Sequence, residues 1–269
     1  MLEKVFTTEL GSIHYWISTV DDSKPWLVLL PGLTADHRLF DMQLSEFESK
    51  YNCFTWDAPG HGASRPFKLD YTMEDKAYFL HSIFEQEGIE KPVLIGQSMG
   101  GYVSQMYMEK YPGAVSGFIS IDSCPLNRRY YSWWELALLK RTYWMYMSIP
   151  WKWLVKWGSS GTATTAYGRK LMKSFMDSYD KKEYCQLADH GYKMLAEAVA
   201  AGYDYDINCP ALLICGERDM AGSAKRYNEQ WTKIDGHPMV WLKDAGHNAN
   251  TDKPEDVNRL IVDFVEDIK

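Results

Sequence analysis

One stretch near the middle of the chain constrains the fold more than any other: Val93-Leu94-Ile95-Gly96-Gln97-Ser98-Met99-Gly100-Gly101. Apolar residues lead into Gly96, and apolar residues at helical spacing follow, so the stretch predicts a buried strand, a tight turn and a helix. Ser98 stands in the pattern G-x-S-x-G, and small residues are needed two positions before and after a side chain on such a strained turn. We therefore expect Ser98 to be an exposed nucleophile, with the backbone N–H of Met99 free to bind a developing oxyanion.

Strands and helices alternate on both sides of this turn. An edge hairpin is predicted at residues 4–8 and 12–19, and further strands at residues 26–30, 51–56, 92–96, 115–121, 211–215 and 239–242. Helices are predicted at residues 39–50, 72–88, from the turn to about 111, at 224–231 and at 254–268. This alternation indicates an α/β fold, with a mostly parallel sheet covered by helices on both faces.

Residues 123–206 interrupt the alternation, because they contain no clear strand and are crowded with Trp and Tyr. We expect helical pieces broken at Pro150 and at residues 158–161, followed by one long helix over residues 181–201. The predicted organisation is a core formed by residues 1–124 and 206–269 with a helical, aromatic-rich cap at residues 125–205.

Three strand ends carry residues whose chemistry fits together. Ser98 follows a central strand, Asp219 follows the strand at 211–215, and His247 follows the strand at 239–242. In a parallel sheet, reactive residues gather outside the carboxyl ends of the strands. Imidazole, with a pKa near 6.5, suits a base that takes the serine proton, and a carboxylate orients that imidazole. Asp122 also ends a strand and is the alternative acid.

At this point the sequence resembles the α/β-hydrolase family over nearly the whole chain outside the insertion. Ser98, Asp219 and His247 match the family's nucleophile, acid and base in the same chain order. Some members carry the acid at the earlier strand end, which keeps Asp122 as an alternative. The resemblance implies a cofactor-free enzyme built on an α/β-hydrolase fold, with the insertion as a cap over the nucleophile.

Two loops extend the resemblance. Pro31-Gly32-Leu33 matches the oxyanion loop, where many members have His-Gly, and residues 57–64, Asp-Ala-Pro-Gly-His-Gly-Ala-Ser, resemble the family's structural D-x-x-G-x-G-x-S loop. The resemblance implies that the backbone N–H groups of Leu33 and Met99 form an oxyanion hole.

The expected cap supplies the candidate pocket residues. Trp133, Trp144 and Met145 are predicted to reach the substrate from the cap, and Gln97 from the turn before Ser98. Aromatic and Met side chains favour an apolar, adaptable pocket. These aromatics could instead form the cap's own core, or, around residues 151–157, a patch for lipid aggregates, although Pro150 limits a continuous amphipathic helix there.

Composition and charge exclude several other classes. The net charge is −7 and no cluster of Lys or Arg stands out, which argues against a nucleic-acid partner. No apolar run approaches the roughly 20 residues of a bilayer span, so stable membrane insertion is not expected.

Five scattered cysteines and the absence of a secretory signal predict reduced thiols and a cytoplasmic protein. The dispersed histidines predict no metal site. The sequence carries no indication of an oligomeric state.

The predicted function is a serine hydrolase that cleaves a carboxylic ester of a small or medium apolar substrate through an acyl-enzyme. The same three residues could act on a carbon–carbon, thioester, amide or lactone bond, because fold and triad do not separate these substrates. Serine rather than aspartate at the nucleophile position argues against dehalogenase and epoxide-hydrolase chemistry. A binder of apolar ligands without turnover is the alternative from another class.

Overall fold

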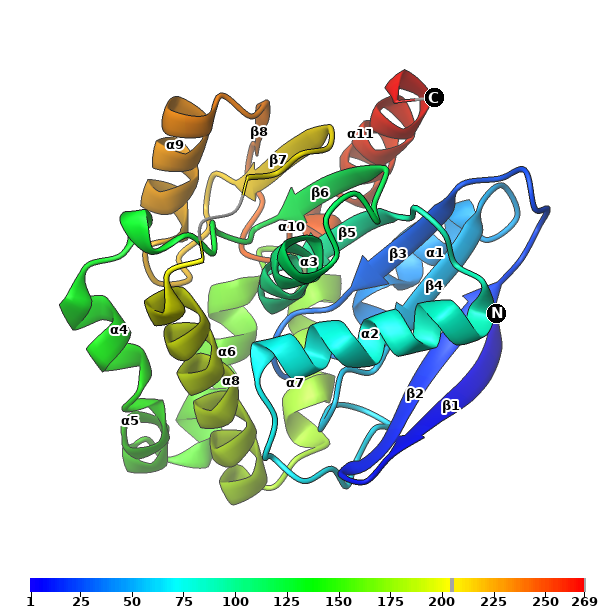
Figure 1. Cartoon of the computed structure of the whole chain (residues 1–269). Coiled ribbons are helices and arrows are strands. Elements are labelled where there is room, and N and C mark those ends of the chain that lie inside the picture. Colours follow the sequence, from blue (N-terminus) through cyan, green and yellow to red (C-terminus); the bar gives the residue numbers. More distant parts are fainter. Residues whose placement is uncertain (204–205, 269) are drawn as a thin grey trace.

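The computed structural model describes residues 1–203 and 206–268 and is built around one sheet of eight strands (Figure 1). The spatial order of the strands is β1-β2-β4-β3-β5-β6-β7-β8. Their bounds are β1 Leu2–Thr8, β2 Gly11–Ser18, β3 Trp26–Leu30, β4 Asn52–Trp56, β5 Val93–Gln97, β6 Gly117–Ile121, β7 Ala211–Gly216 and β8 Met239–Leu242. The pairs β1–β2 and β2–β4 are antiparallel and all others are parallel. The predicted α/β fold with a mostly parallel sheet is confirmed.

Burial along the strands explains why helices must cover both faces. Every residue of β4, β5, β6 and β7 is buried, whereas β1 at the edge is exposed or half-buried throughout. Along β5, Leu94 belongs to one hydrophobic core cluster and its neighbours Val93 and Ile95 to another. Because neighbouring strand residues point to opposite faces, the molecule has two cores, one on each side of the sheet.

The helices of the core lie where the alternation predicts them. On one face lie α2 (Met73–Glu87), α3 (Met99–Lys110) and α9 (Ala224–Asp235), and on the other α1 (Asp41–Phe47) and α11 (Pro254–Asp267), as Figure 1 shows. The side chain of Thr72 caps the start of α2 in a reciprocal pair with Asp75, and Gly88 ends this helix with a φ of 66°. Such caps satisfy backbone groups that a helix end otherwise leaves unpaired.

A block of helices separates β6 from β7 and is called the helical insertion below. It contains the short turn η2 (Arg128–Tyr130), α4 (Trp133–Leu139), α5 (Thr142–Ser148), α6 (Trp151–Thr162), α7 (Ala166–Asp177) and α8 (Lys181–Ala201). The predicted long helix over residues 181–201 is confirmed. Residues 204 and 205, where the predicted cap meets the core, lie outside the described residues.

The predicted break at residues 158–161 is wrong, because α6 continues through both glycines to Thr162. A Cβ atom on Gly158 would lie 2.8 Å from the sulfur of Met176 in α7, so the two helices pack closely at this glycine. Tertiary packing overrides the low helical propensity of glycine at this position.

Smaller differences concern helix ends. The predicted helix at residues 39–50 is a short 3₁₀ turn, η1 (His37–Phe40), followed by the shorter α1. The short helix α10 (Ala249–Asp252) was not predicted, because four residues are too few to show a helical period.

All five cysteines are unpaired, and four of them are buried. Among the described helices, none is both long enough and apolar enough to cross a bilayer.

Candidate active site

Ser98 stands on a strained turn between β5 and α3. Its backbone has a φ of 50° and a ψ of −116°, a conformation that residues other than glycine rarely adopt. A Cβ atom on Gly96 would overlap the backbone of Gly101, and one on Gly100 would overlap the backbone of Leu30. The glycines of the G-x-S-x-G pattern are therefore required sterically, and the turn directs the Ser98 hydroxyl away from the sheet.

The structure brings Ser98, His247 and Asp219 together from three separate strand ends. The Nε2 atom of His247 lies 2.8 Å from the Oγ of Ser98, and its Nδ1 lies 3.0 Å from the Oδ2 of Asp219. The Asp219 side chain is fully buried, and its Oδ1 accepts a hydrogen bond of 2.8 Å from the N–H of Ala221. A carboxylate fixed in this way can hold a proton on Nδ1 and leave Nε2 free to accept the serine proton.

Asp122, the alternative acid, makes different contacts. Its two carboxylate oxygens accept hydrogen bonds from the N–H of Gly216, at 2.7 Å, and from the N–H of Ala249, at 2.8 Å. Gly216 precedes Asp219 by three residues and Ala249 follows His247 by two. Asp122 therefore ties together the two loops that carry the other acid and the base, and it makes no hydrogen bond to His247 within the described chain.

Burial and the charge of Asp219 act in opposite directions on the pKa of His247 and in the same direction on the pKa of Asp122. Burial alone would lower the pKa of His247, but the carboxylates of Asp219 and Asp122 raise it above its usual value. Burial and the neighbouring Asp219 raise the pKa of Asp122 well above its usual value. The site thus favours a positive charge on the imidazole, which is the charge that develops when His247 accepts a proton.

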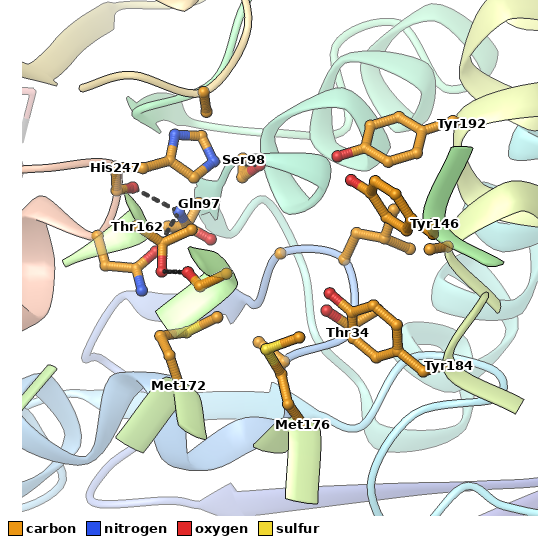
Figure 2. Close-up of a pocket in the computed structure, with 17 residues that line it drawn as sticks. Thr34, Gln97, Ser98, Tyr146, Thr162, Met172, Met176, Tyr184, Tyr192 and His247 are labelled. Carbon is orange, nitrogen blue, oxygen red and sulfur yellow. Dashed lines mark hydrogen bonds between the residues drawn. The ribbon is translucent and has the colours of Figure 1, made fainter. Parts of the chain in front are cut away.

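Two backbone N–H groups near Ser98 are available to a ligand. Within the described residues, neither Leu33 nor Met99 donates its N–H to a protein acceptor. The side-chain amide of Gln97, the residue before Ser98, donates to the carbonyl oxygen of His247 at 2.8 Å and to the side chain of Asn248 at 3.1 Å. Gln97 therefore braces the histidine loop, and Figure 2 shows it beside His247.

Two cavities meet at Ser98. The smaller has a volume of about 140 Å³ and lies between the loop that carries Leu33 and the helices α5 to α8. Figure 2 shows the Tyr, Thr and Met side chains that line it: Thr34, Tyr146, Thr162, Met172, Met176, Tyr184 and Tyr192. The larger, of about 650 Å³, is mainly apolar and runs between α4, α5, α6 and the loop after β7. Both cavities have Ser98 and His247 in their walls.

The predicted pocket residues have different outcomes. Gln97 lines the smaller cavity and Met145 the larger one, whereas Trp133 and Trp144 are each 75% exposed and line neither of these two cavities. Successive helix residues point about 100° apart, and Trp134 and Met145 occupy the cavity side of their helices. Trp133 and Trp144 each precede one of these residues and face outward instead, so the prediction for Trp133 and Trp144 is wrong.

Sequence reasoning missed the walls supplied by α7 and α8. Tyr184, Ala188 and Tyr192 line the smaller cavity at intervals of four residues along α8, and Met172 and Met176 do so along α7. This spacing places each set on one face of its helix. The repeated interval was visible in the sequence, but nothing in it indicated which face meets Ser98.

Two groups of acidic, His and Cys side chains are close enough to suggest a metal: Asp36, His37 and Asp57, and Asp122, Cys215 and Asp219. Protein donors already engage the carboxylates of both groups, since Asp57 accepts from His37 and Ala63 and Asp122 accepts from two backbone N–H groups. Arg38 forms an ion pair with Asp36.

The strand order, the turn that bears Ser98 and the histidine after the last strand define an α/β-hydrolase. The chain belongs to the α/β hydrolase fold family, whose model matches residues 25–254. Curated relatives include human "Epoxide hydrolase 4", 24% identical over 96% of this chain and 76% of that protein. Another is the "Putative carbamate hydrolase RutD" of Escherichia coli O6:H1, 22% identical over 88% of this chain and 87% of that protein.

Solved structures share the fold at low identity. A structure from a study of carboxylesterases of the thaumarchaeon Nitrososphaera gargenis has a TM-score of 0.77 at 18% identity, covering 98% of both chains. The enol-lactonase of Burkholderia xenovorans LB400 has a TM-score of 0.73 at 21% identity, covering 98% of this chain and all of that one. Family and relatives together support a hydrolase.

Proposed function

We propose that this protein is a serine hydrolase that cleaves carboxylic esters with an apolar portion through an acyl-enzyme. The observation that carries the proposal is the continuous line of hydrogen-bond contacts from Asp219 through His247 to the Oγ of Ser98. It stands beside two uncommitted backbone N–H groups and a mainly apolar cavity of about 650 Å³.

Each step uses a group that is already in position. His247 takes the proton of Ser98 as the oxygen attacks the ester carbonyl, and the N–H groups of Leu33 and Met99 bind the oxyanion. Collapse of the tetrahedral intermediate releases the alcohol, which receives the proton from His247. A water molecule, deprotonated by the same imidazole, then attacks the acyl-enzyme and frees the carboxylic acid and Ser98.

The epoxide-hydrolase names among the relatives raise a second chemistry, and Ser98 argues against it. Attack of a serine oxygen on an epoxide carbon would leave an alkyl ether on the enzyme. That ether has no carbonyl group for water to attack, so the oxyanion donors and His247 would not release it. An acyl-serine, in contrast, has the carbonyl that this site is built to activate.

Hydrolysis of p-nitrophenyl esters from acetate to palmitate tests the proposal. We expect turnover by the native chain, a loss of at least about 10³-fold in Ser98→Ala, and no change in Ser160→Ala, which removes an exposed hydroxyl in α6. The acyl-chain preference would show how much of the larger cavity the substrate fills.

Two results would contradict the ester proposal in different ways. A native chain that is inactive on every ester but is labelled at Ser98 by a fluorophosphonate, with labelling abolished in His247→Ala, would keep the nucleophile and move the substrate to thioesters, amides, lactones or carbon–carbon bonds. A Ser98 that reacts with neither esters nor the fluorophosphonate would indicate a binder without turnover.

A further inference from the structure

The exposed aromatic surface of this protein is concentrated on one part of the helical insertion. Eight large hydrophobic side chains are exposed on α4, α5, α6 and the loop after β7: Trp133, Trp134, Leu138, Trp144, Met145, Trp153, Trp157 and Met220. All of the strongly exposed Trp residues in the described chain belong to this set. We call these eight residues the tryptophan face. Exposed apolar surface of this extent commonly marks an interaction site.

The tryptophan face includes part of the wall of the larger cavity. Five of its members also line that cavity: Trp134, Leu138, Met145, Trp157 and Met220. Each of them is therefore part of the cavity wall and open to solvent at the same time. The rings of Trp153 and Trp157 lie 5.9 Å apart and extend the apolar surface along α6. An apolar molecule that enters the cavity past these side chains reaches Ser98, which lines the same cavity.

The same segment is basic within an acidic chain. Residues 133–157 contain four basic residues and one acidic residue, whereas the whole chain has a net charge of −7. The acidic residue, Glu135, is buried and paired with Arg226. The basic residues Lys140, Arg141, Lys152 and Lys156 are all exposed, and the ammonium group of Lys156 lies 5.1 Å from the ring centre of Trp153.

We propose that the tryptophan face docks on the surface of an anionic lipid bilayer. Trp and Leu side chains interleaved with Lys and Arg suit the boundary between headgroups and acyl chains, where the rings enter the apolar layer and the cations meet lipid phosphates. A second copy of the chain fits less well, because a symmetric dimer through this face would bring two surfaces of the same positive charge together.

The docking proposal does not depend on catalysis, so it is tested with the full chain carrying Ser98→Ala. Flotation with vesicles of phosphatidylcholine and phosphatidylglycerol is compared with flotation with vesicles of phosphatidylcholine alone. We expect binding to the anionic vesicles and much weaker binding to the neutral ones. Adding salt is expected to weaken the binding, because it screens the cations from the phosphates.

Two sets of substitutions locate the contact. Trp133→Ala, Trp144→Ala and Trp153→Ala together are expected to lower the fraction bound by about tenfold or more, and none of these residues lines either cavity at Ser98. The matched control removes exposed side chains elsewhere, with Leu2→Ala, Tyr78→Ala and Ile234→Ala. Replacing Lys152 and Lys156 by Gln is expected to cost about fivefold for each charge on anionic vesicles.

Several results would overturn the proposal. One is a chain that floats with neither type of vesicle, and another is a triple tryptophan variant that binds as well as the control. A dimer seen by light scattering that the tryptophan variant disperses, without vesicle binding, would assign the face to a second copy. In the native-serine background, hydrolysis of a short dissolved ester is expected to be equal in the tryptophan variant and the control.

Discussion

Replacing Asp219 by Asn tests the assignment of the acid more sharply than any other change. In the native site, Oδ2 of Asp219 faces Nδ1 of His247 at 3.0 Å while Oδ1 accepts the N–H of Ala221. In the Asp219→Asn variant the amide oxygen can keep the bond to Ala221, which turns the NH₂ group toward His247. A donor at that position requires Nδ1 to be an acceptor, so the imidazole proton moves to Nε2.

The proton on Nε2 then faces the Ser98 hydroxyl, and His247 can no longer accept the serine proton. The equivalent change of tautomer in a serine-hydrolase triad lowers kcat by about 10⁴-fold. Because Asn is nearly the same size as Asp and keeps one hydrogen bond, we expect the free energy of unfolding to change far less than the activity. The measurement is kcat on a dissolved p-nitrophenyl ester, together with urea denaturation of the same preparation.

Asp122→Asn is the matched control, because this residue ends the neighbouring strand and contacts both loops. Its two oxygens serve two N–H donors, and an Asn can accept only one of them while its NH₂ group meets the other. One unsatisfied buried donor costs about 1–3 kcal/mol of stability. We therefore expect the free energy of unfolding to fall while kcat stays within about tenfold at temperatures where the variant is folded. If Asp122→Asn loses about 10⁴-fold in kcat and Asp219→Asn does not, the assignment of Asp219 is wrong.

Two further predictions follow from the shifted pKa values of His247 and Lys76. The neighbouring carboxylates raise the pKa of His247, so kcat/KM for an ester is expected to be lost as pH falls through a value above 6.5. The pH at which half of kcat/KM is lost should be lower in Asp122→Asn, because one of these carboxylates is removed. An unchanged value in that variant would contradict the role given to the Asp122 charge. Burial lowers the pKa of Lys76, in α2, from 10.5 to about 7, so the folded state is penalised wherever the unfolded lysine is charged. Lys76→Met is expected to raise the free energy of unfolding by a few kcal/mol at neutral pH and by almost nothing near pH 10.5. Urea denaturation at the two pH values measures this difference. An equal gain at both pH values would show that the charge of the buried lysine is not the cause.

The core of the fold was predictable because its strands are short, apolar and separated by clear turn signals. The helix over residues 181–201 was also predictable, since Asp180 caps its start and Gly202, with a φ of 70°, ends it. Gly158 shows the limit of such reasoning. It packs closely against the sulfur of Met176 in the next helix, and no local pattern carries that contact.

The placement of Ser98, Asp219 and His247 was predictable for a topological reason: parallel strands bring their carboxyl ends to one edge of the sheet. The pocket walls were less predictable. They depend on how each helix of the insertion is rotated about its axis, and a rotation of about 100° exchanges Trp133 with Trp134. Composition indicated an aromatic insertion, but not which rings would face the cavity and which would face outward.

The choice between Asp122 and Asp219 shows why the same residue type at neighbouring strand ends can have different roles. Both aspartates are buried, and both lie in loops beside His247. At Asp122 the backbone has a φ of 48°, and the carboxylate receives two N–H donors that belong to the loops on either side. At Asp219 one oxygen is held by Ala221 and the other remains for the imidazole. Of the two carboxylates, only the one after β7 places an oxygen within hydrogen-bond distance of Nδ1 of His247, which is why the acid is assigned to Asp219.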